Sequence, residues 1–261
     1  MIEIRNPLLH YTLHLADNAL ILGQRNAEWT GHGPVLEQDI AISNIALDLV
    51  GQARMLYQYA AALMNQPAGQ PIARPATEDT LAYLRNADQF SNCLLAELEK
   101  GDWAVTVLRQ FFFSSYQFYF YERLQNSKDQ TLAAIAAKSL KEVTYHLRWS
   151  AEWVIRLGDG TDESHRRMTA ALQLLWPYTA EMVTNARYET VLAEQGIAVN
   201  LDAIKQPYQS KLQQVLSAAT LQIPSNMVMH YGGKQGEHTG AMAAILAEMQ
   251  YLQRTYPDAK W

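Results

Sequence analysis

The chain has 261 residues, of which 49% are hydrophobic and 18% are charged, and it has a formal net charge of −5 and one cysteine. This balance predicts a folded core, and the lack of a basic block argues against nucleic-acid or membrane-surface partners. Cys93 has no second cysteine to pair with, and residues 1–7 lack the apolar stretch of a signal peptide. We therefore expect a cytoplasmic protein without an internal disulfide.

Helical periodicity runs through almost the whole chain, and no convincing stretch alternates apolar and polar residues as a strand would. The pattern predicts four long helices, at residues 8–27, 36–64, 103–125 and 132–157. The first two are joined by a tight turn at Thr30–Pro34, which is rich in Gly and Pro.

A longer and looser connection, residues 65–102, separates the second long helix from the third. Its prolines Pro67, Pro71 and Pro75 exclude a regular helix at its start. Thr77 is placed to cap a short helix at 78–86, because its hydroxyl can accept from a free N–H of the first turn. A second short helix should precede the break at Gly101.

After the stop at Gly158–Gly160, residues 163–194 are predicted to form one long helix that Pro177 kinks. Further helices are expected near 207–219 and 239–256. We interpret the glycine-rich segment between them, 231–236, as a flexible connection.

Four long helices in two hairpins with one long crossover are typical of a ferritin-like bundle. The predicted fold is therefore an all-α, ferritin-like four-helix bundle with additional C-terminal helices. We expect a single domain over residues 1–261, with the core bundle at about 8–157 and the kinked helix and C-terminal helices at about 160–261.

Bundles of this type hold two iron ions with a Glu on each of two helices and a Glu-x-x-His motif on each of the other two. Asp17, Asp48 and Glu142 lie on otherwise apolar stripes, and the spacing across the tight turn predicts that Asp17 and Asp48 lie at similar heights. Buried carboxylates are costly unless they are paired or bind a metal, so these three acids are the candidate remnant of such a site.

The ligand set is incomplete. Gly51 and Tyr145 stand three residues after Asp48 and Glu142, where histidines are required, and the middle of helix 103–125 offers no acid. His146 follows Glu142 by four residues and can share its face. We therefore predict no metal and no cofactor in this chain, and we propose Arg109 as the internal counter-charge of the three acids.

Helix 103–125 carries aromatic residues on every face, which is typical of a helix that is buried all round. One side is expected inside the bundle. The other can pack on a partner chain or on the chain's own late helices, and the sequence does not separate these two arrangements.

Five segments together resemble the C subunits of bacterial phenylacetyl-CoA epoxidases, which belong to multicomponent monooxygenases, and the resemblance covers essentially the whole chain. The segments are Glu28–His32, Leu47–Arg54, Gln89–Asn92, Lys141–Arg148 and Leu246–Arg254.

The resemblance implies a subunit without catalytic residues that forms a tight heteromer with a di-iron catalytic A subunit. It implies that the A subunit binds the CoA thioester, that further subunits deliver electrons from NADPH, and that the complex epoxidises the ring of phenylacetyl-CoA. It also suggests contact with the CoA ester through Gln89, Phe90, Ser91 and Asn92 and through Thr190, Val191 and Leu192. Ordinary packing explains both segments at least as well.

Two alternatives stay open at this stage. The chain can itself be a di-iron oxygenase that uses Asp17, Asp48, Glu142 and His146, or it can be a stand-alone helical protein that binds a CoA ester. Homodimer formation is also left open.

Overall fold

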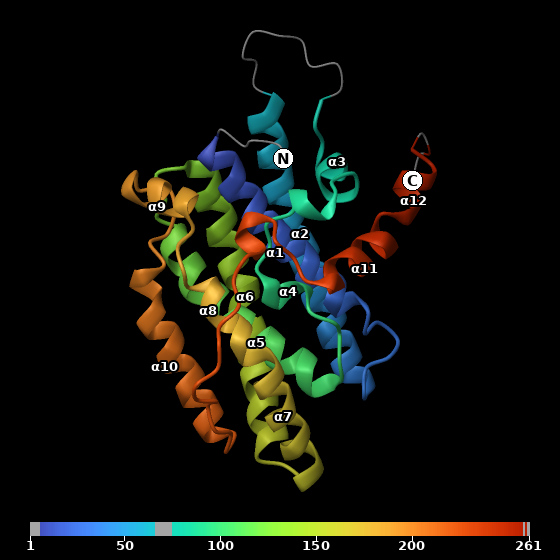
Figure 1. Ribbon diagram of the computed structural model, residues 1–261, viewed down its shortest axis with the longest axis vertical. Helices are drawn as coiled ribbons and strands as arrows, with labels where there is room; N and C mark the ends of the chain where they lie inside the picture. The colour runs from blue at the N-terminus through green and yellow to red at the C-terminus, as the bar shows by residue number, and fades with distance from the viewer. Residues whose placement is uncertain (1–5, 66–74, 258, 260–261) are drawn as a thin grey trace.

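A computed structural model describes residues 6–65, 75–257 and 259, and within them it is helical without strands. The four long helices at its centre are α1 (Pro7–Ala27), α2 (Leu36–Asn65), α5 (Trp103–Leu124) and α6 (Gln130–Gly158). Helix α1 packs along α2 and α5 packs along α6, which gives the two hairpins in Figure 1. The predicted all-α, ferritin-like fold is confirmed.

Side-chain caps begin three of these helices where the sequence places them. Asn6 accepts from the backbone N–H of Leu8 and precedes Pro7, whose fixed φ suits the first helical position. Asp102 and Asp129 cap α5 and α6 in the same way. Each cap satisfies an N–H group that the first turn leaves free.

The crossover between α2 and α5 contains the short helices α3 (Glu78–Tyr83) and α4 (Leu94–Glu97) and the 3₁₀ turn η1 (Ala87–Gln89). Thr77 caps α3 as predicted, by accepting from the N–H of Thr80. Two of the prolines expected to break the chain, Pro67 and Pro71, lie outside the described residues.

The prediction of one long kinked helix over 163–194 is wrong. The structure has α7 (Asp162–Leu175), the 3₁₀ turn η2 (Trp176–Tyr178), α8 (Thr179–Met182) and α9 (Arg187–Glu194). Pro177 lacks an N–H and ends α7 instead of bending it. A second break between α8 and α9 leaves the carbonyl of Thr184 free to accept from Lys234.

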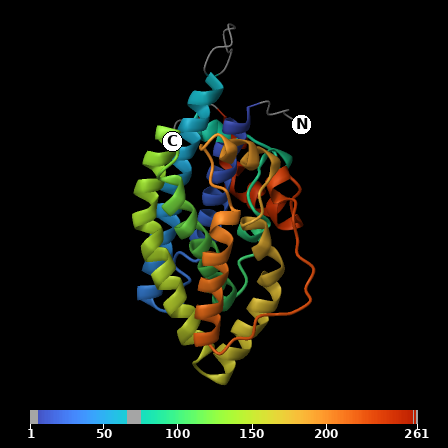
Figure 2. The same ribbon diagram turned by 90° about the vertical axis from the view of Figure 1, so that its left-hand side faces the viewer.

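Helix α10 (Asp202–Ala218) lies against α5 and α6 and is the orange helix at the front of Figure 2. At its end, the carbonyl oxygen of Ala219 approaches Gly158 so closely that a Cβ there would lie 2.4 Å from it. The predicted C-terminal helix is divided at Gln250 into α11 (Gly240–Met249) and α12 (Tyr251–Thr255). Gln250 donates to the carbonyls of Ala82 and Arg85. These hydrogen bonds hold the junction of α11 and α12 against the end of α3.

The chain itself buries the aromatic helix α5. Phe111, Phe112 and Phe113 are fully buried, and α5 contacts α4, α6, α7 and α10. The late helices α7 and α10 therefore cover the side of α5 that a partner chain could otherwise have covered. Within the described residues, no helix is long and apolar enough to cross a membrane.

Candidate functional site

His146 lies in the bundle centre as the sequence suggested, but the other inward positions of α2 and α6 are one residue away from those predicted. Helices α2 and α6 turn Leu49, Gln52, Val143 and His146 inward, and all four are 0% exposed. Each pair has the i, i+3 spacing of a Glu-x-x-His motif. The acids Asp48 and Glu142 instead lie half-buried at the seam between the two helices, and Gly51 and Tyr145 are exposed. The register predicted for the degenerate site is therefore shifted by one residue.

Each seam acid is paired with an inward side chain of the opposite helix. Asp48 Oδ2 lies 2.9 Å from Nε2 of His146, and Glu142 Oε2 accepts from Nε2 of Gln52 at 2.9 Å. Helix α5 reaches the same amide with two side chains that donate to Gln52 Oε1, Gln117 at 3.4 Å and Tyr121 at 3.3 Å. The centre thus holds two hydrogen-bonded groups, His146 with Asp48 and Gln52 with Glu142, Gln117 and Tyr121.

Asp17 belongs to neither group, so the prediction of similar heights is wrong. Its carboxylate accepts from the hydroxyl of Tyr57 at 2.6 Å. Tyr57 lies nine residues beyond Asp48, which is about 13 Å along α2. The first turns of α2 run past the end of α1 beside the connecting turn, where the hydroxyl of Thr30 lies 3.1 Å from that of Ser43. This overhang shifts α2 relative to α1.

The proposal of Arg109 as the counter-charge is also wrong. Arg109 Nη1 donates to the carbonyls of Leu98 and Glu99 at 2.6 and 3.0 Å, so it ties the start of α5 to the chain before it. Burial, and next the positive charge of Arg25, lowers the pKa of Arg109 to about 9.

The partner of Asp17 is Arg85, from the crossover. Both guanidinium Nη atoms donate to the carboxylate, and Nη2 also donates to the hydroxyl of Tyr57 at 3.0 Å. The guanidinium carbon lies 4.0 Å from the ring centroid of Phe90, and the N–H of Ser91 donates to Asp17 at 2.9 Å. Burial is the largest single influence and works against the charge of Arg85, but Asp17 and Tyr57 together outweigh it and raise the pKa of Arg85.

These residues do not fit a di-iron centre. Such a centre needs four carboxylates and two histidines around the bundle axis, whereas the centre offers one histidine and two seam carboxylates that are already hydrogen-bonded. Asp17 is saturated by Arg85, Tyr57 and Ser91. In the described residues, no three His, Cys, Asp or Glu side chains are grouped to hold a metal ion.

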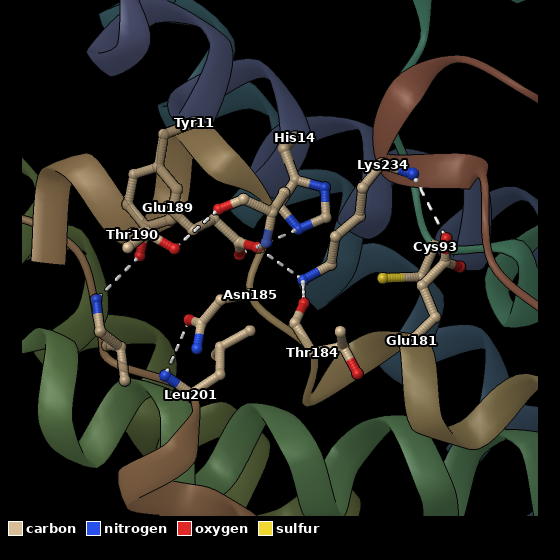
Figure 3. Close-up of polar contacts among 12 residues, drawn as sticks. Tyr11, His14, Cys93, Glu181, Thr184, Asn185, Glu189, Thr190, Leu201 and Lys234 are labelled. Carbon is tan, nitrogen blue, oxygen red and sulfur yellow. Dashed lines mark hydrogen bonds and ion pairs between the residues drawn. The ribbon is translucent and has the colours of Figure 1, made fainter.

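A second buried polar cluster lies between the bundle and the late helices (Figure 3). Lys234, only 2% exposed, donates from Nζ to Glu189 Oε2 at 2.8 Å and to the carbonyl of Thr184 at 2.9 Å. It enters from the 3₁₀ turn η3 (Gly233–Gln235). A Cβ at Gly233 would lie 2.2 Å from the carbonyl oxygen of Asn92, so only glycine allows this approach. The glycine-rich segment is a buried anchor, not a flexible connection.

Two more buried acids hold the same C-terminal segment. Glu181 accepts from the backbone N–H of Leu94 at 2.7 Å and of Gly232 at 2.9 Å, and burial raises its pKa. Glu97 accepts from the N–H of Thr239 at 2.6 Å and from Nδ1 of His238 at 2.6 Å. These acids join α4 and α8 to the chain that leads into α11.

His14 is neutral in this cluster. Its Nδ1 donates to the carbonyl of Ser91 at 2.5 Å, and its Nε2 lies 3.2 Å from the amide nitrogen of Asn18. Burial, and next the charge of Lys234, lowers the pKa of His14 to about 3. The 3.9 Å approach of Nε2 to Glu189 is therefore not an ion pair.

A measurable pH dependence follows from His14. Its pKa is near 6.5 when the chain is unfolded and about 3 when it is folded, so the unfolded state takes up a proton as the pH falls below 6.5. We expect the parent to lose about 2 kcal/mol more stability between pH 7.5 and pH 5 than His14→Gln. Urea unfolding of both proteins measures this difference, and equal losses would contradict the neutral imidazole.

The two predicted CoA-contact segments occupy different environments. Phe90, Ser91 and Asn92 are buried, and Asn92 donates to Glu97 at 2.9 Å, so these side chains serve the interior. Gln89 is partly exposed at the end of η1. On α9, Thr190 and Val191 are exposed and Leu192 is buried.

The shape of this molecule defines it as an all-α, ferritin-like protein. The family model described as phenylacetic acid catabolic protein matches residues 1–261, and the chain belongs to this family. It is 44% identical over 256 residues to the C subunit of the 1,2-phenylacetyl-CoA epoxidase of Escherichia coli (strain K12), a match that covers 98% of this chain and 100% of that relative.

Proposed function

We propose that this chain is a non-catalytic structural subunit of a phenylacetyl-CoA epoxidase complex in aerobic phenylacetate catabolism. In this role it pairs with the di-iron catalytic A subunit and stabilises it. The observation that carries the proposal is the bundle centre, where Leu49, Gln52 and Val143 occupy three of the four inward motif positions of α2 and α6. Hydrogen bonds that Gln52 and His146 make with the seam acids hold together a centre of this kind without iron.

Two further observations support the role of a partner subunit. The relative is named as one subunit of an epoxidase, which fits a chain that works within a complex. The outer side of α2 exposes large apolar side chains, including Leu36 at 72% and Leu47 at 68%. Contiguous exposed apolar surface is typical of a protein–protein interface.

Co-expression with a ferritin-like catalytic A subunit tests the proposal. We expect the tagged chain to retain the A subunit through size-exclusion chromatography, because subunits of this kind share a large interface. Epoxidation of phenylacetyl-CoA should require the A subunit and should be absent with this chain alone. A chain that elutes alone after co-expression would refute the pairing.

Iron analysis of the purified chain separates the proposal from the alternative of a catalytic di-iron protein. We expect no stoichiometric iron, because the two seam acids and His146 are hydrogen-bonded to the protein itself. Two iron ions per chain, lost in Glu142→Ala, would favour the catalytic alternative instead. Binding of a CoA ester by a chain that never joins the A subunit would favour the stand-alone binding protein.

A further inference from the structure

The outer face of α2 carries four exposed apolar side chains over its first half, with Ser43 and Asn44 between the second and third of them. Leu36, Ile40, Leu47 and Val50 recur at helical spacing and are 72%, 52%, 68% and 42% exposed. One turn further on, the same side of the helix carries Arg54, whose side chain is 70% exposed. The apolar stripe therefore runs for about 22 Å and then ends, which is the length of a four-turn contact with another helix.

Gly51 closes this stripe, and no contact among the described residues explains a glycine there. It lies in the middle of α2, is exposed, and a Cβ built on it would meet nothing within 4 Å. Glycine in a helix interior is unfavourable compared with alanine. Neither a turn, a positive φ nor a close contact in the described residues requires it, so its use points to close approach by another chain.

The edge of the stripe is acidic. Asp48 and Glu142 flank the seam between α2 and α6, and each is hydrogen-bonded through one carboxylate oxygen to an inward side chain. Among the described residues, no hydrogen bond reaches the second oxygen of either carboxylate. Tyr145, 40% exposed on α6, lies beside this seam. The guanidinium carbon of Arg148, from the same helix, lies 5.9 Å from the centroid of its ring. A basic side chain from outside would therefore find the two carboxylates here.

We propose that this face, the α2 stripe with Gly51 and Tyr145, docks a helix of the catalytic A subunit. The partner helix packs closest at Gly51 and places a basic side chain between Asp48 and Glu142. A second copy of this chain fits less well, because a two-fold contact would bring the same acids toward one another. This inference rests on the proposed function, since it names the surface through which that pairing occurs.

Two substitutions test the face. Gly51→Leu fills the space that the partner helix needs, and Leu47→Glu places a charge in the stripe. We expect each to weaken binding of the A subunit at least about tenfold, because both act at the centre of the contact. The matched control is Leu174→Glu, which changes another exposed leucine, 56% exposed on α7, and should leave binding unchanged.

Thermal unfolding of the isolated chain shows whether a variant has failed to fold. Leucine is the better helix former, so we expect Gly51→Leu to melt about 2 °C higher than the parent while it binds more weakly. If both variants bind the A subunit as well as the parent does, the assignment of this docking face is wrong and the proposed function stands. If the parent itself does not bind, the proposed function fails. Self-association of the parent through this face would overturn the choice of partner.

Discussion

We expect Arg85→Met to lower the free energy of unfolding by about 3–5 kcal/mol, because the change leaves the carboxylate of Asp17 buried without its counter-charge. Asp17 is 0% exposed and Arg85 is 8% exposed, so water cannot replace the lost guanidinium. The same guanidinium also donates to the carbonyls of Leu81 and Gln89. Chemical denaturation at pH 7 measures the loss.

The double variant Asp17→Asn/Arg85→Met separates the effect of leaving Asp17 charged without a partner from the effect of losing the packing of Arg85. An uncharged amide at position 17 removes most of the desolvation cost, so we expect the double variant to recover at least half of the lost stability. Arg54→Met is the matched control, since the side chain of Arg54 is 70% exposed; its effect should stay within about 0.5 kcal/mol. If Arg85→Met unfolds at the same denaturant concentration as the parent, Arg85 is not the counter-charge.

Local chemistry in the sequence predicted where most elements begin and end. Thr77 begins α3, Gly158 ends α6, and the four long helices match their predicted ranges closely, because caps and breakers act within one turn. Pro177 shows the limit of such signals. The sequence correctly predicts that this proline interrupts a helix. Whether a proline kinks or ends a helix depends on what the unpaired backbone groups beside it contact, and the sequence pattern does not show those contacts.

The bundle site was harder to predict because it depends on two quantities that no local signal gives. The first is the shift of α2 past α1, which pairs Asp17 with Tyr57 and separates it from Asp48. The second is the rotation of each helix, because a difference of one residue turns a side chain by about 100°. The sequence placed the acids on the right helices and indicated His146 on their face, but it did not show that Gln52 points inward or that the acids themselves lie at the seam.

Arg85 and Lys234 were missed for a related reason. Both come from irregular segments that pack on the bundle, and both pair with acids distant in sequence, Asp17 and Glu189. A usable signal was present for Lys234, because closely spaced glycines around a single lysine favour a tight approach of backbone to backbone. Nothing comparable marks Arg85, since an arginine after a short helix is an ordinary surface residue in most sequences.

The anchor formed by Lys234 leads to the second large expected effect. Lys234→Met keeps a similar chain length but removes the cation beside Glu189, which is 0% exposed, and it leaves the carbonyl of Thr184 without a donor. We expect a loss of about 3–5 kcal/mol in the free energy of unfolding. Amide hydrogen exchange should rise first in residues 230–239, because Lys234 secures this segment to α8 and α9.

Lys205→Met is the control, because Lys205 is exposed on α10 and its replacement should change stability by less than about 0.5 kcal/mol. Lys234→Met/Glu189→Gln tests the pairing itself. A glutamine at 189 can still accept from the N–H of Ala186, which now donates to Glu189 Oε2 at 2.7 Å, and it carries no charge that needs Lys234. The double variant should therefore be more stable than Lys234→Met alone. If it is less stable, Lys234 acts through contacts other than its ion pair with Glu189.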